Sequence, residues 1–133
     1  MSELDIRKWL SNITETVKAK DLAKHMDLVS ENVAVYGLPG GKTLSYADWY
    51  TRRQNEFNRG LLKNLSYEKL QIKTIGLRRL IFNIEELMDA SNGDLVIIDK
   101  SITIESEQDN KWRVVEENIN NWKYLRAPKK RRS

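Results

Sequence analysis

Glu86 and Lys100 are the residues whose types and predicted positions most directly indicate chemistry. They lie in two segments, 78–90 and 94–105, in which apolar residues recur at every second position, the period of a β-strand. If the segments pair as a hairpin around a three-residue loop at 91–93, the two charged residues become diagonal neighbours on an otherwise apolar face. Buried charge is costly unless it is paired or solvated. The pair is therefore either a structural ion pair near the open end of the sheet or part of a ligand cavity.

The alternative turn for this hairpin, a two-residue loop at Asn92-Gly93, places polar residues opposite apolar ones. We prefer the three-residue loop because it gives one face that can pack on helices. In that register Glu85 faces Asp99 on the other side of the sheet. Like charges in this position need water or a nearby cation, such as Lys73 or Arg78.

The first half of the chain predicts the helices that must cover this sheet. A capping box at Ser2 begins the first helix, whose apolar residues recur at helical spacing. A short second helix is predicted within 20–30, ending before Asn32. Residues 33–44 predict a short strand, a Pro-Gly-Gly turn and a second short strand. Ser45 caps a third helix that ends near Gly60. Long strands follow from Leu65 onward, so the sheet is expected to curve strongly.

The segment "NKWRVVEENINNW", residues 110–122, fits two periods. Its apolar residues form a helical stripe, and its first residues also alternate as in a strand. Asparagines at 118, 120 and 121 disfavour a helix, so we predict a last strand. The Val114-Val115 pair breaks the alternation and predicts a bulge or a strand buried on both faces. Whether Glu116 points into a cavity or into water is left open.

Composition limits the possible functions. The chain has 133 residues, enough for one domain, and contains no cysteine and one histidine, His25. This argues against thiol catalysis, cysteine-ligated zinc and sites built from several histidines. We read His25 as a half-buried helical residue. We find no metal, phosphate or nucleotide motif and expect no cofactor.

Basic charge is concentrated at the carboxyl end. Residues 126–133, "RAPKKRRS", hold five of the 23 basic residues, which leaves 18 basic against 19 acidic residues in 1–125. We therefore expect a domain over 1–125 and a basic, disordered tail, which argues against nucleic acid as the main partner. The amino terminus has no signal-peptide pattern and no apolar run could cross a bilayer, so a cytoplasmic protein without a membrane role is expected.

The order of elements resembles the NTF2-like superfamily, in particular its SnoaL-like members. The resemblance rests on two helices, the segment "ENVAVYGLPGG", the helix "YADWYTRRQNEF" and strands ending in "DNKWRVVEENINNW". It implies an α+β, cystatin-like fold: three helices packed on a strongly curved mixed or antiparallel sheet that forms a cone with an internal pocket. Enzymes of this group commonly use a pocket carboxylate as general base and a hydrogen-bonding group at a developing oxyanion.

The resemblance implies six site residues. Glu86 and Glu116 are the candidate catalytic carboxylates, and the candidate ligand-binding residues are Tyr36, Trp49, Arg53 and Lys100. Each also has a structural reading, because the aromatic residues could be core residues, Arg53 could reach solvent and Glu116 could point outward. Some relatives carry a histidine in the last strand where this chain has Glu116, Glu117 and Asn118.

Two functions remain open from the sequence. One is a pocket for a small hydrophobic or amphipathic ligand, in which a proton-transfer reaction of isomerase or dehydratase type could occur. The other is a non-catalytic homodimer or protein-interaction module. Its dimer would form through the outer face of the sheet, where Leu87, Leu95 and Ile97 are predicted.

Overall fold

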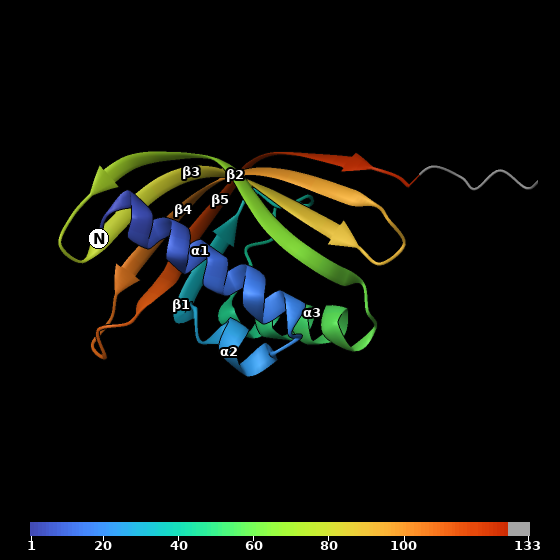
Figure 1. Ribbon diagram of the computed structural model, residues 1–133, viewed down its shortest axis with the longest axis horizontal. Coiled ribbons are helices and arrows are strands. Elements are labelled where there is room, and N and C mark those ends of the chain that lie inside the picture. The colour runs from blue at the N-terminus through green and yellow to red at the C-terminus, as the bar shows by residue number, and fades with distance from the viewer. Residues whose placement is uncertain (128–133) are drawn as a thin grey trace, which may run out of the picture.

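A strongly curved sheet arches over three helices in the computed structural model, which describes residues 1–127 (Figure 1). The elements, in chain order, are α1 Glu3–Lys18, α2 Leu22–Met26, β1 Val29–Tyr36, α3 Tyr46–Asn58, β2 Leu62–Ile75, β3 Arg79–Ala90, β4 Leu95–Ser106 and β5 Trp112–Leu125. The strand order is β1-β5-β4-β3-β2, with β1 parallel to β5 and all other neighbours antiparallel. The predicted α+β fold with a mixed sheet is confirmed. Most of the predicted tail lies outside the described residues.

The two longer helices begin at the predicted capping boxes. Ser2 accepts a hydrogen bond from the backbone N–H of Asp5, whose carboxylate bonds back to the Ser2 N–H, and Ser45 and Asp48 repeat the arrangement at α3. α1 buries its apolar stripe against the concave side of the sheet, and its contacts with β2 are the most extensive that any helix makes. None of the helices in the described part of the chain is long and apolar enough to cross a membrane.

The second helix is shorter than predicted. α2 ends at Met26, and β1 already begins at Val29, which is paired with Val114 of β5. A five-residue helix has little stability of its own, so pairing of the β-branched Val29 with the sheet overrides the helical pattern. The second short strand predicted before α3 is only a single bridge between Val35 and Leu44.

The predicted register of β3 and β4 is confirmed. Ile84 lies opposite Lys100 and Glu86 opposite Ile98, so the two charged residues are diagonal neighbours on the concave face. Glu85 lies opposite Asp99 on the outer face, as expected, and the cation beside it is Lys69, at 3.2 Å, instead of Lys73 or Arg78. Leu87 and Ile97 also lie opposite each other on that outer face, where the homodimer stays a prediction.

The last segment is a strand, and it contains the predicted bulge. Ile104 of β4 pairs with Val114, while the residue before it, Thr103, pairs with Glu116, so Val115 is the extra residue. Because of this insertion, the inward-facing residue after Val114 is Glu117, which is buried. The bulge therefore decides which of the two glutamates enters the interior.

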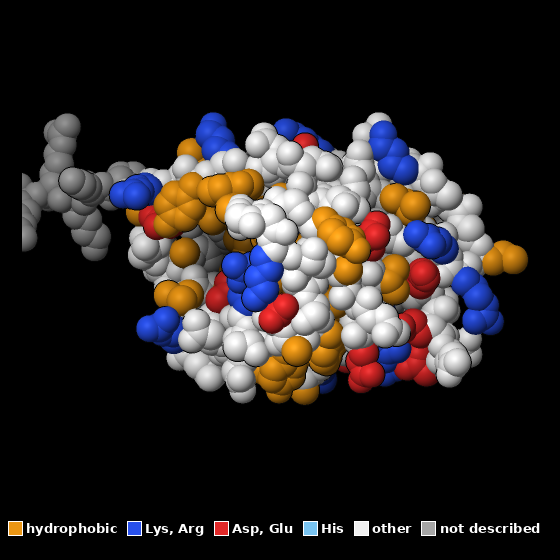
Figure 2. Space-filling model, turned by 180° about the vertical axis from the view of Figure 1, so that it is seen from behind, with side chains coloured by type: hydrophobic (Ala, Val, Ile, Leu, Met, Phe, Trp, Pro, Cys, Tyr) orange, Lys and Arg blue, Asp and Glu red, His pale blue; other side chains and the backbone are white. Residues whose placement is uncertain are grey.

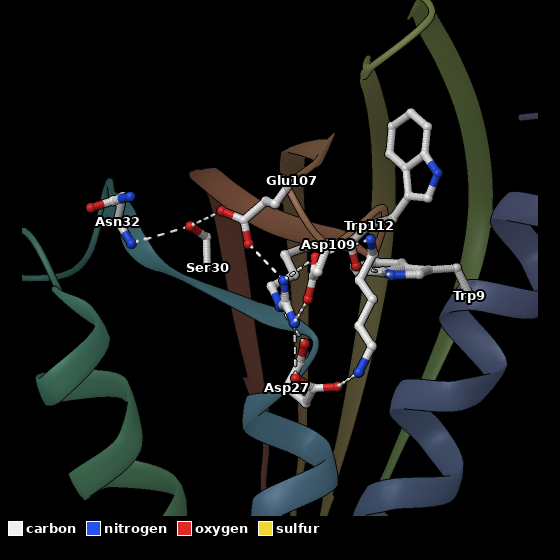
Figure 3. A network of polar contacts seen from close by, with 9 residues as sticks. Trp9, Asp27, Ser30, Asn32, Glu107, Asp109 and Trp112 are labelled. Atoms are coloured by element: carbon white, nitrogen blue, oxygen red, sulfur yellow. Dashed lines mark hydrogen bonds and ion pairs between the residues drawn. The ribbon is translucent and has the colours of Figure 1, made fainter.

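A polar network holds the turn between the carboxyl end of β4 and the amino end of β5 against the start of β1 (Figure 3). Arg113 donates to Asp27 at 3.0 Å, to Asp109 at 2.8 Å and to Glu107 at 3.0 Å, and Glu107 accepts from Ser30 at 2.8 Å. Since each of these residues has a partner from a different segment, the network acts as a structural clamp.

Gly37, directly after β1, approaches β5 more closely than any side chain would allow. Its φ is +85°, and an added Cβ would overlap the carbonyl oxygen of Ile119. Gly40 has a similar φ of +87° but open space around it. We predict that both alanine variants lose stability, by about 1–2 kcal/mol from the backbone conformation alone, and that Gly37→Ala loses clearly more. Urea denaturation of both variants checks this, and equal losses would show that the loop yields without cost.

Candidate functional site

A cavity of about 270 Å³ lies between α3, the 37–44 loop and the concave face of β3, β4 and β5. Much of its wall is aliphatic, with Trp49 as the aromatic residue. Its ionisable lining residues are Arg52, Arg53, Glu56, Glu86, Lys100 and Glu117. The cavity thus combines an apolar wall with a group of charges, as many ligand sites do.

Glu86, Lys100 and Glu117 form a buried ion triad in this cavity. The Lys100 Nζ lies 2.9 Å from a carboxylate oxygen of Glu86 and 2.9 Å from one of Glu117. The three residues are 2%, 4% and 5% exposed. One ammonium group is therefore the shared ion-pair partner of two buried carboxylates.

Arg53 provides the second buried cation. It is 6% exposed; its Nε donates to His25 Nε2 at 3.1 Å and its Nη1 to Glu56 at 2.9 Å. Its guanidinium carbon lies 5.9 Å from the centre of the Trp49 ring, within the range of a cation–π contact. These contacts hold the guanidinium in one orientation.

His25 is a positioning residue and not a base. Its Nε2 accepts the Arg53 hydrogen bond, so the ring proton lies on Nδ1, which faces Thr16 Oγ1 at 3.0 Å. The Thr16 hydroxyl in turn donates to the Ile13 carbonyl at 2.7 Å. Burial and the positive charge of Arg53 lower the pKa of His25 to about 3, so the ring stays neutral. The sequence places His25 half-buried, whereas it is fully buried.

The two carboxyl groups of the triad have opposite pKa shifts. Burial raises the pKa of Glu117 above its ordinary value; Lys100 offsets part of this effect and the negative charge of Glu86 adds to it. Burial also acts to raise the pKa of Glu86, but Lys100 and Arg53 outweigh it and hold that pKa below its ordinary value. Although burial opposes its charge, the two carboxylates raise the pKa of Lys100. The surroundings thus favour the protonated form of Glu117 and the ionised form of Glu86.

Tyr67 of β2 adds a hydroxyl beside the triad, since it lies opposite Glu86 in the sheet. Burial and the charges of Glu86 and Glu117 raise the pKa of Tyr67 well above its ordinary value. It therefore remains a neutral phenol that can donate a hydrogen bond. Tyr67 and several other residues also line a void of about 10 Å³ next to the cavity.

Trp49 carries an unpaired donor. The residue is 9% exposed, and its buried indole Nε1 has no hydrogen-bond partner among residues 1–127. Trp49 lines both the cavity and the smaller void. An orphaned buried donor costs about 1–3 kcal/mol, which an acceptor brought by a ligand would offset.

Four of the six predicted site residues come together, and two do not. Glu86, Lys100, Trp49 and Arg53 line the cavity. Tyr36 and Glu116 are not among the residues that line the cavity. Tyr36 is 42% exposed, because Val35 is the residue of β1 that faces the cavity. Because Val115 is the bulge residue, Glu116 shares the outer face with Asn118, whose amide donates to it at 3.1 Å.

Sequence reasoning missed Glu117, Tyr67 and the role of His25. The signal for Glu117 was present, because a bulge at Val114-Val115 makes the third residue after Val114 face inward. Tyr67 carried no signal of its own, since three register shifts interrupt the pairing of β2 with β3. Among the residues that the structure describes, no group of three or more histidines, cysteines or acids could hold a metal ion.

No family model matches the chain, and no curated protein matches it either. Solved structures do resemble it, and the three described next share 9–15% of their residues with it.

An NTF-2 like protein of unknown function from Shewanella oneidensis MR-1 superposes with a TM-score of 0.74 at 15% identity, over 90% of this chain and 98% of that one. An NTF2-like protein from Cytophaga hutchinsonii ATCC 33406 gives 0.70 at 12% identity, over 90% and 98% of the two chains. A candidate scytalone dehydratase from Novosphingobium aromaticivorans DSM 12444 gives 0.66 at 9% identity, over 92% and 87%. At these identities the likeness concerns the fold.

Proposed function

The chain has the NTF2-like fold, and from that premise we propose that its cavity binds a small molecule and that Glu117 transfers a proton to or from it. The observation that carries the proposal is the sharing of the Lys100 ammonium by two buried carboxylates whose pKa values move apart. Two titratable groups with opposite shifts commonly divide acid and base roles between them.

The division of roles follows from the contacts of each group. Glu86 stays ionised and, together with Glu117, keeps Lys100 protonated. Glu117, with its raised pKa, is a stronger base when ionised than an ordinary carboxylate and a usable acid when protonated. The apolar wall strengthens each electrostatic contact with a bound molecule. One structural neighbour bears the name of a dehydratase, a class of reaction in which a proton is moved.

Lys100 keeps an ion-pair partner after Glu117 has accepted a proton. When Glu117 takes a proton, the triad loses one negative charge and Lys100 remains paired with Glu86, 2.9 Å away. The buried positive charge is therefore never left without a partner. This makes the proton transfer reversible at low energetic cost within the site.

The proposal can be tested without knowing the natural substrate. Nitrobenzisoxazole is a neutral aromatic compound whose ring opens when a carboxylate removes one proton, and apolar surroundings accelerate the reaction. We expect the folded protein to open it with saturation kinetics, about 10²-fold or more faster per carboxylate than acetate does. A rate equal to that of acetate, or one unchanged by unfolding the protein, would reject proton transfer and leave the non-catalytic module as the remaining function.

A further inference from the structure

We propose that the cavity selects amphipathic anions with an aromatic body: Arg53, with Arg52, holds a carboxylate head group, and Trp122 stacks against the body at the cavity mouth. The inference rests on the proposed function only in taking the cavity to be a ligand site. It does not depend on proton transfer by Glu117.

The Arg53 side chain is held in a fixed orientation and has one nitrogen, Nη2, that is available as a donor. Two of its nitrogens are occupied by His25 and Glu56, while Nη2 makes no hydrogen bond within residues 1–127. Lys100, the other buried cation of the cavity, is shared by two carboxylates. A planar guanidinium in a fixed orientation is well suited to a carboxylate oxygen. The free edge of Arg53 is therefore the position at which an anion is bound.

The charges of the cavity favour one negative charge on the ligand. Its lining contains three cations, Arg52, Arg53 and Lys100, and three carboxyl groups. Glu117, whose pKa is raised, is the carboxyl group that can be neutral. The three cations balance the three carboxyl groups when all are ionised, and protonation of one carboxyl group would leave one net positive charge for a monoanionic head group to neutralise. The unpaired Trp49 Nε1 in the same wall adds a donor that an oxygen acceptor would satisfy.

Trp122 lies on the cavity side of β5, beyond the cavity itself. It pairs with Ile98, a cavity-lining residue, and paired residues of antiparallel strands share a face. It is 49% exposed, which is high for a tryptophan on a rigid strand. The strand is held nearby, because the Tyr124 hydroxyl and the Ala127 N–H both donate to Asp94. Figure 2 shows hydrophobic side chains gathered at the end of the molecule where the chain leaves β5.

Because the cavity is small, Trp122 at its mouth could contribute to the binding of a larger ligand. At about 270 Å³ it is slightly below the range of about 300–1,000 Å³ that ligand pockets usually have. If the head group lies at Arg53, a ligand that is too long for the cavity would extend from its mouth. An aromatic body would there meet the face of Trp122, while a short polar ligand would not reach it.

The test uses two probes that differ only in charge, naphthoate and its uncharged amide, naphthamide. Calorimetry measures their affinities, and the indole N–H resonances of the four tryptophans report where they bind. We expect naphthoate to bind at one site about tenfold or more tighter than naphthamide and to shift the Trp49 indole signal. Equal affinities, no binding of naphthoate, or an unmoved Trp49 signal would overturn the proposal.

A variant pair tests the rim. Trp122→Ala should weaken both probes about fivefold, because stacking does not depend on the charge of the head group. Tyr36→Ala removes a similarly exposed aromatic residue from the outer face of the neighbouring strand and should change neither affinity. Equal effects of the two variants would reject Trp122 as a specificity residue. These measurements involve no turnover, so they can succeed where the proton-transfer assay fails, and the reverse.

Discussion

Replacing Lys100 with methionine should lower the free energy of unfolding by about 3–5 kcal/mol near neutral pH. Methionine is similar in length and apolar, so the variant fills the same space without the ammonium group. It leaves Glu86 and Glu117 buried with each other and without their shared cation. The loss is large because two uncompensated carboxylates, and not a single broken contact, remain in the interior.

The loss in the free energy of unfolding of Lys100→Met should be smallest at acidic pH. Without Lys100, burial and mutual repulsion should shift the pKa of both carboxyl groups upward, although Arg53 still acts to lower them. A carboxyl group with a raised pKa in the folded state stabilises the fold below its ordinary pKa and loses that contribution as the pH rises through the raised value. The deficit relative to wild type should therefore be smaller at about pH 4 than at about pH 7. Urea denaturation at both values measures it.

Lys69→Met is the matched control for this experiment. Lys69 also pairs with a glutamate, Glu85, at 3.2 Å, but its side chain is 75% exposed. An exposed ion pair contributes about 0–1 kcal/mol, so this variant should behave almost as wild type at either pH. If Lys100→Met cost no more than Lys69→Met, the triad would not be the buried charge cluster described above.

Glu117→Gln should lower the rate of nitrobenzisoxazole opening by about 10²–10³-fold. Glutamine keeps the shape of the side chain and an oxygen that can accept from Lys100, but it cannot take a proton. The variant should therefore remain folded while losing the base. The rate at saturating probe, together with the unfolding curve of the same sample, separates lost chemistry from lost structure.

Glu116→Gln provides the matched control on the neighbouring residue. Its side chain lies on the outer face, bonded to Asn118, so its removal should leave the rate unchanged. A loss of rate in both variants, or only in Glu116→Gln, would mean that the direction of the two side chains has been assigned wrongly. The pair thus tests the consequence of the bulge at Val115 as well as the chemistry.

Local patterns predicted most of the fold. Capping boxes at Ser2 and Ser45 set the starts of α1 and α3, and period-two alternation gave β3 and β4 with their register. The neighbouring positions of Glu86 and Lys100 followed from that register alone. These features are local, since each depends on residues within one element or one hairpin.

The predictions differ from the structure mainly at residues whose positions depend on contacts between distant segments. Val29 fits a helical stripe, but pairing with Val114 turns it into a strand residue. Tyr36 follows Val35, and a single residue's difference in phase places it outside the cavity. Glu117 differs from these, because the bulge predicted at Val114-Val115 by itself turns the Glu117 side chain inward. Its partnership with Lys100 depends on how β4 and β5 pair.

The most direct test of the account is a pH titration of the glutamate carboxyl carbons by NMR, with Glu117→Gln and Glu86→Gln used to assign the two signals. Glu117 should be half-protonated at a pH above the ordinary pKa of glutamate, while Glu86 should stay ionised below that value. Both carboxyl groups titrating at or below the ordinary value would contradict it. The cavity would then contain a structural ion triad and no group suited to proton transfer.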